Sequence, residues 1–456
     1  MLMNVLLVRP KPDRETIGLQ HVMVCEPLEL EYLVSNVPVG IRNSVSLEIC
    51  DMILENDSFI NILKRKKPDL VVFTGYITHV GTIKAMCADV KRLFPVTLTG
   101  VGGVHAEVVP ADFTDPSIDF VYSSNGIDGF NMTLEGILEG SSAAEIRQRL
   151  EASDEKKLSF IYRHPDREAV RKYRQSYYYM FHRPCALIKT SYGCPYNCSF
   201  CFCKEITRGK YFTRDLNDVI NELEAIEEKE IYIVDDDFLF SRIRIREFLR
   251  LLKERGIDKK FLVYGRADFV SENKDLLREF RDQGLQAVIV GLESIREADL
   301  DSYKKGTDLD INERAVSVLN ELGIELYATL IIPLDFSKKD FSDLTSWVRG
   351  LGIRFVNLQP LTPLPGTSIF KDYEDKLLYP RERYEMWDMA HVVLKPEHMG
   401  TRAFYLQIVK AYYRIVMRPK NLIALIRRYG IGMNLRMLAG SNRVTMQYLG
   451  KVVRGK

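Results

Sequence analysis

Two series of short apolar runs, each followed by a segment with helical periodicity, constrain the fold of this 456-residue chain more than any other feature. The first series begins at "MNVLLVRP" and ends at "IDFVYSSNG", within about residues 1–140. Apolar strands that alternate with amphipathic helices are typical of a parallel sheet covered by helices on both faces. We therefore assign residues 1–140 to a doubly wound, Rossmann-like domain of an α/β protein.

The second series contains six strand-like runs, namely "CALIKT", "EIYIVD", "KFLVYG", "LQAVIVG", "ELYATLII" and "RFVNLQP". Six successive strand–helix units favour an open, partial (β/α)6 barrel over a second flat sheet. We assign residues 181–376 to this barrel and residues 141–180 to a polar linker. Residues 377–456 are predicted to form a helical, basic C-terminal region.

The chain has no stretch that approaches the roughly 18 uninterrupted apolar residues of a membrane span, and its first residues do not resemble a signal peptide. We therefore expect a cytoplasmic protein. In a reducing compartment its eight cysteines are expected to be thiols or metal ligands rather than disulfides. Cys25, Cys50 and Cys87 stand singly among apolar residues, and we interpret them as core residues.

Four of the cysteines lie within "CPYNCSFCFC", and Cys194, Cys198 and Cys201 have the spacing CxxxCxxC directly after the first barrel strand. A structural zinc site ordinarily needs four protein ligands, and no second pair of ligands is evident here. Three thiolates suit a four-iron cluster in which one iron remains open to a small molecule. Cys203 is either a spare thiol or a reactive group.

This spacing resembles that of the radical S-adenosylmethionine (radical SAM) superfamily. The resemblance implies a [4Fe-4S] cluster whose open iron binds S-adenosylmethionine, and reductive cleavage that releases a 5′-deoxyadenosyl radical. It implies that Tyr196 faces the adenine. It also implies acidic residues near the ammonium group of the ligand, where this chain has Asp235, Asp236 and Asp237; we select Asp236 as the binding residue.

Three further segments are similar to the same family in the same order, and the last of them is "LQPLTPLPGTSIF", which is similar to the proline-rich end of the sixth strand. "VYGRADFV" places Arg266 where it would meet the carboxylate of S-adenosylmethionine. "VIVGLESIREADLDSYKKGT" places Glu293 and Ser294 near the ribose. Taken singly, each match is weak, because the aspartates are also explained as a helix cap and Arg266 as part of an ordinary surface salt bridge. Their order after CxxxCxxC makes the resemblance strong.

The N-terminal domain lacks GxGxxG after its first strand, which argues against a dinucleotide site. "TGVGGVHAEVVPADF" instead resembles the cobalamin-binding domain that precedes the barrel in one branch of the superfamily, and it implies Gly102, Gly103 and His105 as cobalamin contacts. The usual histidine ligand of cobalt has no counterpart after the first strand. His79 is one alternative ligand, and binding without a histidine is the other.

The resemblance implies a cobalamin-dependent radical SAM enzyme, and we hypothesise C-methylation at an unactivated carbon of a hydrophobic small molecule, which includes lipids. The alternative keeps both cofactors without methyl transfer, as a cyclase, ring-contracting or oxidising enzyme. A non-enzymatic iron–sulfur scaffold or sensor is a third hypothesis. No second cysteine cluster is present, so an external electron donor, flavodoxin or ferredoxin, is expected.

The C-terminal region has an unusual charge. From His398 onward it contains twelve basic and no acidic residues, so the rest of the chain carries ten net negative charges under the formal total of +2. Lys410, Arg414 and Arg418 share one stripe of a predicted helix whose remaining surface is apolar. This helix either caps the barrel with its basic stripe in solvent, or rests on anionic lipid as a peripheral membrane contact. A nucleic-acid partner is not expected.

Overall fold

A computed structural model describes residues 2–123, 125–153 and 161–454. The chain is divided between two compact units, and neither unit is continuous in sequence. The first unit comprises Met1–Thr16, Glu26–Ser176 and Glu382–Asp388. The second comprises Ile17–Cys25, Tyr177–Arg381 and Met389–Lys456. The chain therefore crosses between the units five times.

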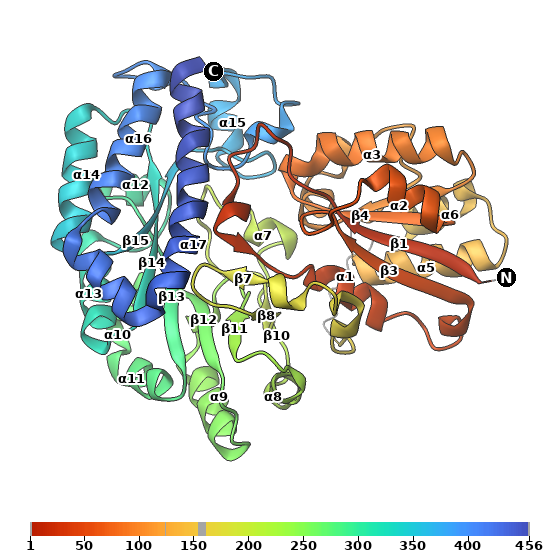
Figure 1. Cartoon of the computed structure of the whole chain (residues 1–456), viewed down its shortest axis with the longest axis horizontal. Coiled ribbons are helices and arrows are strands. Elements are labelled where there is room, and N and C mark those ends of the chain that lie inside the picture. Colours follow the sequence, from red (N-terminus) through yellow and green to blue (C-terminus); the bar gives the residue numbers. More distant parts are fainter. Residues whose placement is uncertain (1, 124, 154–160, 455–456) are drawn as a thin grey trace. The chain divides into compact units, whose positions relative to one another are not determined.

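The first unit is built on five parallel strands, β1 (Met3–Arg9), β3 (Val45–Asp51), β4 (Leu70–Thr74), β5 (Leu98–Gly102) and β6 (Phe120–Val121). Its helices are α1 (Leu28–Ser35), α2 (Phe59–Lys66), α3 (Val80–Leu93), α4 (Val104–Val108), α5 (Gly126–Leu138) and α6 (Ala143–Ala152). The strand order is β3-β1-β4-β5-β6, so the direction of winding reverses between β1 and β4. Helices lie on both sides of the sheet (Figure 1). The predicted doubly wound fold is confirmed.

The second unit is built on six parallel strands that the sequence predicts one by one. They are β8 (Cys185–Ile188), β11 (Glu230–Ile233), β12 (Lys260–Gly265), β13 (Leu285–Glu293), β14 (Glu325–Ile332) and β15 (Phe355–Pro360). They lie in sequence order from β8 to β15, and the sheet is not closed. This arrangement confirms the partial barrel.

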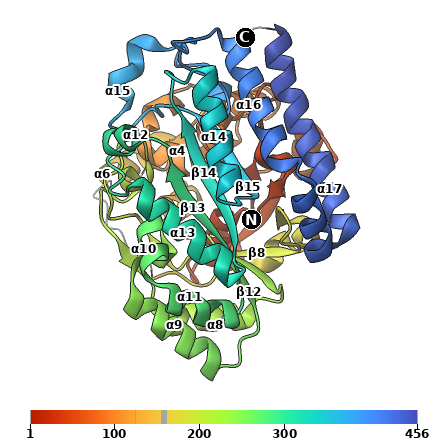
Figure 2. The ribbon, with the colours of Figure 1, turned by 90° about the vertical axis from the view of Figure 1, so that its left-hand side faces the viewer.

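Helices cover the outer face of this sheet (Figure 2). They are α8 (Leu216–Ala225), α9 (Arg242–Glu254), α10 (Ala267–Glu272), α11 (Lys274–Asp282), α12 (Glu297–Ser302), α13 (Leu309–Leu322) and α14 (Lys338–Gly350). Side-chain caps explain where several begin: Asp215, Ser241, Asp308 and Ser337 each accept a hydrogen bond from the first helical turn.

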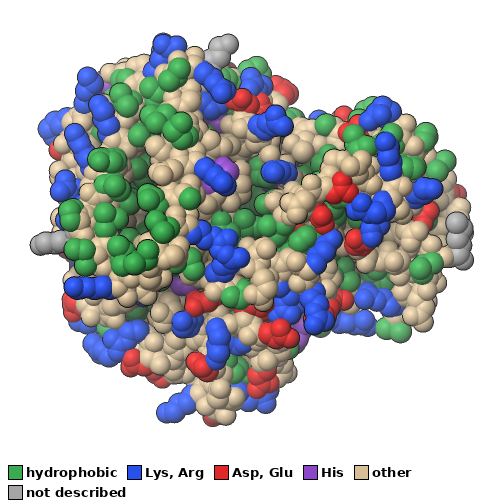
Figure 3. Space-filling model, viewed as in Figure 1, with side chains coloured by type: hydrophobic (Ala, Val, Ile, Leu, Met, Phe, Trp, Pro, Cys, Tyr) green, Lys and Arg blue, Asp and Glu red, His purple; other side chains and the backbone are tan. Residues whose placement is uncertain are grey.

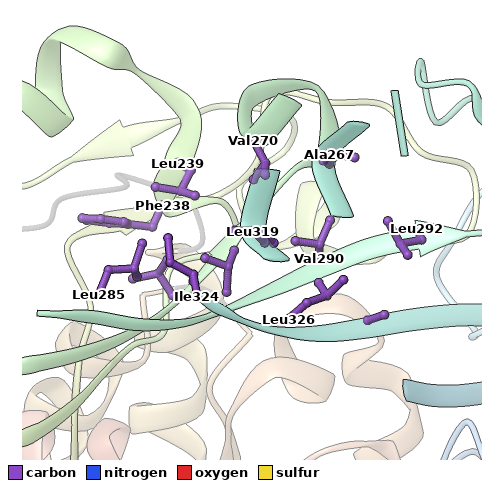
Figure 4. Packing of buried hydrophobic residues seen from close by; sticks show 14 of the residues in the cluster. Phe238, Leu239, Ala267, Val270, Leu285, Val290, Leu292, Leu319, Ile324 and Leu326 are labelled. Carbon is purple, nitrogen blue, oxygen red and sulfur yellow. The ribbon is translucent and has the colours of Figure 1, made fainter. Parts of the chain in front are cut away.

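The core of the second unit lies between the outer face of the sheet and these helices. Figure 4 shows Val290 and Leu326 of the sheet beside Val270 of α10 and Leu319 of α13. Alternate strand residues point to the other face, where Tyr232 and Tyr327 are buried and Tyr264 is partly buried. The ring of Tyr179, from the short strand β7 (Tyr178–Tyr179), lies 4.9 Å from that of Tyr232.

The C-terminal region is less helical than predicted. Residues 377–400 contain one short 3-10 helix, Tyr384–Met386, and an isolated bridge between Leu377 and Leu394. Pro380 and Pro396 explain the difference, because proline cannot donate the hydrogen bond that a continuing helix needs. The helices are α16 (Thr401–Val416) and α17 (Pro419–Arg454), the latter kinked at Gly430. Among the described helices, none is both long and apolar enough to cross a bilayer.

The predicted linker is only partly described. Residues 154–160 lie outside the described residues, whereas α6, within the predicted 141–180 segment, packs against α5 in the first unit. The domain boundaries drawn from the sequence remain a prediction. The remaining short elements are β2 (Met23–Val24), β9 (Ser191–Tyr192), α7 (Cys203–Ile206), β10 (Phe212–Thr213) and α15 (Phe370–Tyr373).

Candidate functional site

The three-cysteine loop follows β8 and β9 at the carboxyl edge of the six-stranded sheet, the edge at which barrel enzymes bind their substrates. Antiparallel pairing of β9 with β10 closes the base of the loop. Gly193 enters the loop with φ +78°, and a Cβ there would lie 2.2 Å from the carbonyl oxygen of Lys210. Only glycine fits this position, so the loop has a defined starting point.

Backbone hydrogen bonds tie the loop to three neighbouring segments. The Gly193 N–H donates to the Asp236 carboxylate at 3.0 Å. The Ser199 N–H donates to the Tyr303 carbonyl at 3.0 Å, and the Ser199 carbonyl accepts from the N–H of Ile369. The segments that follow β11, β13 and β15 therefore all hold the loop.

The three aspartates after β11 have three different environments. Asp235 is buried and accepts from the backbone N–H and hydroxyl of Thr190 and from the hydroxyl of Ser191. Asp236 accepts from Gly193 and lies 3.7 Å from the ammonium of Lys189. These two carboxylates therefore hold the ends of β8 and β11 together.

Asp237 differs, because neither of its carboxylate oxygens has a hydrogen-bond partner within the described part of the chain. Asp237 is only 2% exposed to solvent. Burial raises the pKa of this carboxyl group from 3.8 to about 7, although Arg266 and Lys305 act in the opposite direction. Of the three aspartates, Asp237 is the one with a carboxylate open to a cationic ligand.

The structure brings Arg266 and Tyr196 together. Arg266 directly follows β12, and its guanidinium carbon lies 3.7 Å from the centre of the Tyr196 ring. The guanidinium also donates to Asp268 at 3.0 Å and to the Lys305 carbonyl at 2.9 Å. Arg266 and Tyr196, which separate motifs predict, therefore stack on each other. In this cation–π geometry the face of the tyrosine ring attracts the positive charge of the guanidinium.

Glu293 and Ser294 end β13, and both are engaged with neighbouring residues. The Glu293 carboxylate pairs with the Lys305 ammonium at 2.9 Å, and both side chains are less than a tenth exposed. The Ser294 hydroxyl donates to Asp299 at 2.6 Å. Although burial alone would lower the pKa of Lys305, the Glu293 carboxylate holds that pKa above its usual value.

The cysteine thiols lie among these charges. Burial raises the pKa of Cys194 to about 12. Burial also raises the pKa of Cys198, while Lys305 and Arg266 act to lower it. A hydrogen bond from Cys203 lowers the pKa of Cys201. Cluster assembly therefore has to displace protons from the thiols of Cys194 and Cys198.

The donor set fits an iron–sulfur cluster. Three cysteines stand in one anchored loop, cations lie close to Cys198, and an unpaired buried carboxylate lies beside them. Within residues 2–123, 125–153 and 161–454, no three Cys, His, Asp or Glu side chains are already gathered around one point for a metal ion.

The carboxyl edge of the first unit is built for close backbone approach. Gly102 ends β5, and Gly103 begins α4 with φ +98°. A Cβ at Gly103 would lie 2.9 Å from the Thr74 hydroxyl and 3.0 Å from the backbone of Gly75. The ends of β4 and β5 therefore meet at a place where a side chain would not fit, as a bulky flat ligand against the backbone requires.

The two histidines that the sequence singles out in this unit, His79 and His105, are both buried. His105 is buried, and its Nε2 lies 2.8 Å from the Asp112 carboxylate. His79 accepts from the Tyr76 N–H through Nδ1, and burial lowers its pKa to about 4. The neutral ring of His79 therefore carries its proton on Nε2, which leaves no lone pair there for cobalt. This geometry disfavours His79 as a cobalt ligand.

Sequence reasoning missed Lys305 and gave Asp236 priority over Asp237. Lys305 lies in the quoted stretch "DSYKKGT", but a lysine in a polar loop gives no sign that it will be buried against a glutamate twelve residues earlier. A run of three aspartates gives no sign of which carboxylate remains unpaired.

Comparisons with known proteins match both parts of the chain. Residues 188–348 match the Radical SAM superfamily, and residues 26–130 match the B12 binding domain. The hopanoid C-3 methylase of Methylococcus capsulatus is 27% identical over 90% of this chain and 79% of its own. The anaerobic magnesium-protoporphyrin IX monomethyl ester cyclase of Cereibacter sphaeroides is 25% identical over 83% of this chain and 64% of its own.

A solved structure shares the fold. The radical S-adenosylmethionine methyltransferase TsrM of Kitasatospora setae, solved with cobalamin and a [4Fe-4S] cluster bound, has a TM-score of 0.67 at 18% identity, and the match covers 99% of this chain and all of that one. The matched domains imply a [4Fe-4S] cluster, S-adenosylmethionine and cobalamin as the cofactors of an enzyme. The chain thus contains a radical SAM superfamily domain, preceded by a B12-binding domain.

Proposed function

We propose that the chain is a cobalamin-dependent radical SAM C-methyltransferase that acts on an unactivated carbon of a hydrophobic small molecule. The observation that carries the proposal is the presence, in one chain, of an anchored three-cysteine loop and a B12-binding domain. The name of the hopanoid methylase supports methyl transfer and an apolar substrate, because that relative matches across both domains.

The cofactors supply the difficult chemistry: the cluster and S-adenosylmethionine supply a radical that removes a substrate hydrogen, and cobalamin carries the methyl group. The residues of the chain hold and orient them. We assign the cluster to Cys194, Cys198 and Cys201, and we assign cofactor contacts to Gly102, Gly103, His105, Tyr196, Asp236, Arg266, Glu293 and Ser294.

We add Asp237 to this set as the residue that receives the ammonium group of S-adenosylmethionine. Its carboxylate is buried and unpaired within the described residues, whereas Asp235 and Asp236 accept hydrogen bonds from the ends of β8 and β9. A cation would restore the charged form of Asp237, since burial is what disfavours it. Besides its assigned cofactor contact, Asp236 holds the loop at Gly193.

Arg266 is assigned to the carboxylate of S-adenosylmethionine and Tyr196 to its adenine. The planar guanidinium matches a carboxylate through two parallel hydrogen bonds. Asp268 and the Lys305 carbonyl already fix the orientation of this guanidinium. The electron that the cluster needs is assigned to an external donor, flavodoxin or ferredoxin.

The first test measures cofactor content and products. After anaerobic reconstitution and desalting, we expect about one cobalamin and four irons per chain, and we expect the Cys198→Ala variant to lose iron but keep cobalamin. With polycyclic lipid substrates, turnover should give both S-adenosylhomocysteine and 5′-deoxyadenosine. Four irons without cobalamin would remove the methylation proposal.

The second candidate is radical chemistry without methyl transfer. The match to the anaerobic magnesium-protoporphyrin IX monomethyl ester cyclase, which covers 83% of this chain, supports it. The same assay separates the two, because this candidate gives 5′-deoxyadenosine with a converted tetrapyrrole and no S-adenosylhomocysteine.

A further inference from the structure

Helix α17 presents an apolar stripe on its outer surface after the kink at Gly430. The side chains of this stripe are one or two helical turns apart and are between 48 and 77% exposed: Ile431, Leu435, Leu438, Met446 and Val453. At 3.6 residues per turn they fall within an arc roughly 80° wide. Figure 3 shows apolar side chains gathered over α16 and α17.

The orientation of α17 is fixed by its opposite face. Met437, Tyr448 and Lys451 are buried there. A Cβ on Gly440 would lie 2.1 Å from the carbonyl oxygen of His21, so the helix touches the backbone of that segment. A small rotation of the helix could not simply bury the exposed stripe. It would expose Met437, Tyr448 and Lys451 instead and would break the contact at Gly440.

The apolar surface continues before the kink. On the first part of α17 and the end of α16, the exposed apolar residues are Tyr413, Val416, Met417, Leu422, Ile423 and Ile426. By contrast, most of α16 packs on the barrel through Phe404, Tyr405, Ile408, Ala411 and Ile415. The barrel-capping interpretation is thus correct for α16, whereas α17 carries most of the unpartnered apolar surface.

The charges around the stripe are all of one sign. Arg436 and Arg443 project from one flank of it, and no acidic residue occurs after Glu397. Arg427 and Arg443 are exposed and have neither an ion pair nor a hydrogen bond to a side chain within the described residues. Large apolar side chains flanked by arginines are the arrangement by which a helix lies in the headgroup region of a bilayer.

We propose that α17 and the end of α16 dock the enzyme on an anionic lipid surface. Anionic headgroups supply the negative charge that this region of the chain lacks, and the acyl boundary takes the apolar stripe. A second copy of the chain is a poorer partner, because a two-fold contact would bring the same arginines together. The proposal concerns binding alone and does not depend on the reaction that the enzyme catalyses.

The test is co-sedimentation of the reconstituted full-length enzyme with vesicles of phosphatidylcholine, with and without phosphatidylglycerol. We expect binding to the anionic vesicles that weakens as salt is added. In Ile431→Gln/Leu435→Gln/Leu438→Gln, the ratio of bound to free enzyme should fall at least about tenfold. In Arg427→Gln/Arg443→Gln it should fall about fivefold for each arginine removed.

Ile243→Gln/Arg246→Gln, on the exposed face of α9, is the matched control and should bind as the unaltered enzyme does. Thermal unfolding monitored by circular dichroism should be the same for all variants. The proposal is wrong if the unaltered enzyme ignores anionic vesicles, or if the α17 variants bind them as well as the control does. A dimer in light scattering that the triple variant dissociates, without vesicle binding, would identify a second copy as the partner.

Discussion

Glu293 and Lys305 face each other at 2.9 Å in a nearly water-free environment beside the cysteine loop. Such a pair is costly to break, because removing one partner leaves the other charge buried and uncompensated. Replacing both partners with apolar groups of similar size removes that problem. The pair therefore fixes the end of β13. Loss of the pair should lower the free energy of unfolding even without cofactors or substrate.

We expect Glu293→Gln to lower the free energy of unfolding of the cofactor-free protein by about 3 kcal/mol, because it strands the ammonium of Lys305. Glu293→Gln/Lys305→Met should recover most of this loss. Urea unfolding followed by circular dichroism measures both. Equal stability of the unaltered protein and Glu293→Gln would show that water or another group already neutralises Lys305.

Asp237 gives a prediction about pH. Its folded-state pKa of about 7 lies above its ordinary value of 3.8, so the folded protein binds this proton more tightly than the unfolded chain does. Stability conferred by the protonated group is therefore complete below about pH 4 and is lost as pH rises through about 7. As pH rises from 5 to 8, ionisation of this carboxyl should lower the free energy of unfolding of the cofactor-free protein by on the order of 2 kcal/mol.

Asp237→Asn removes this ionising group. The free energy of unfolding of the variant, compared with that of the unaltered protein at the same pH, should therefore rise between pH 5 and pH 8. The same variant should bind S-adenosylmethionine more weakly in the reconstituted enzyme, which equilibrium dialysis measures. Asp236→Asn is the comparison: it should weaken the Gly193 contact without changing the pH dependence in this way. If the free energy of unfolding depends on pH in the same way in Asp237→Asn and in the unaltered protein, Asp237 is not the buried carboxyl with the raised pKa.

At the scale of elements, two glycines of α17 make a matched pair. A Cβ at Gly440 would lie 2.1 Å from the His21 carbonyl, whereas a Cβ at Gly432 would meet nothing within 4 Å. Gly440→Ala should destabilise the protein by about 2 kcal/mol or detach the helix, because the obstacle is backbone. Gly432→Ala should stabilise it by about 0.5–1 kcal/mol through helix propensity. Thermal unfolding compares them; a harmless Gly440→Ala would mean that α17 is not held at His21.

The turn from β5 into α4 is a second test at this scale. Gly103→Ala should destabilise the first unit by about 2 kcal/mol, since φ +98° disfavours any side chain. It should also reduce the cobalamin retained after desalting. Gly81→Ala, in α3, has open space around its Cβ and should lower neither the stability nor the retained cobalamin. Full cobalamin retention by Gly103→Ala would remove Gly103 from the proposed contacts.

The sequence predicts the elements better than it predicts the site. All six barrel strands follow from buried apolar runs, because a strand covered on both faces must be apolar throughout. The helices after residue 377 are predicted too early, since the apolar periodicity there extends over a segment that Pro380 and Pro396 interrupt. Asp235 finds its partners at Thr190 and Ser191, and Lys305 pairs with Glu293. Single-sequence periodicity carries no information about such pairs, nor about Asp237, which has no hydrogen-bond partner within the described residues.

For the whole molecule, the two compact units predict two unfolding transitions in scanning calorimetry. Hydroxocobalamin should raise the temperature of one transition, assigned to the first unit, because a ligand stabilises only the folded state that binds it. At a free concentration 100-fold above its dissociation constant, the gain is about 2.7 kcal/mol. The Cys198→Ala variant should show the same shift. A single transition that moves as a whole would indicate that the units unfold together.

The five crossings of the chain between its units also limit how such an enzyme can evolve. A recombination event that replaced residues 26–176 would leave behind Met1–Thr16 with strand β1, and Glu382–Asp388 near the other end of the gene. β1 lies between β3 and β4 in the sheet, so a foreign segment would have to form its sheet around a resident central strand. We therefore expect the two units to evolve together, through compensating substitutions at positions far apart in the sequence. Exchange of one unit alone by recombination is not expected.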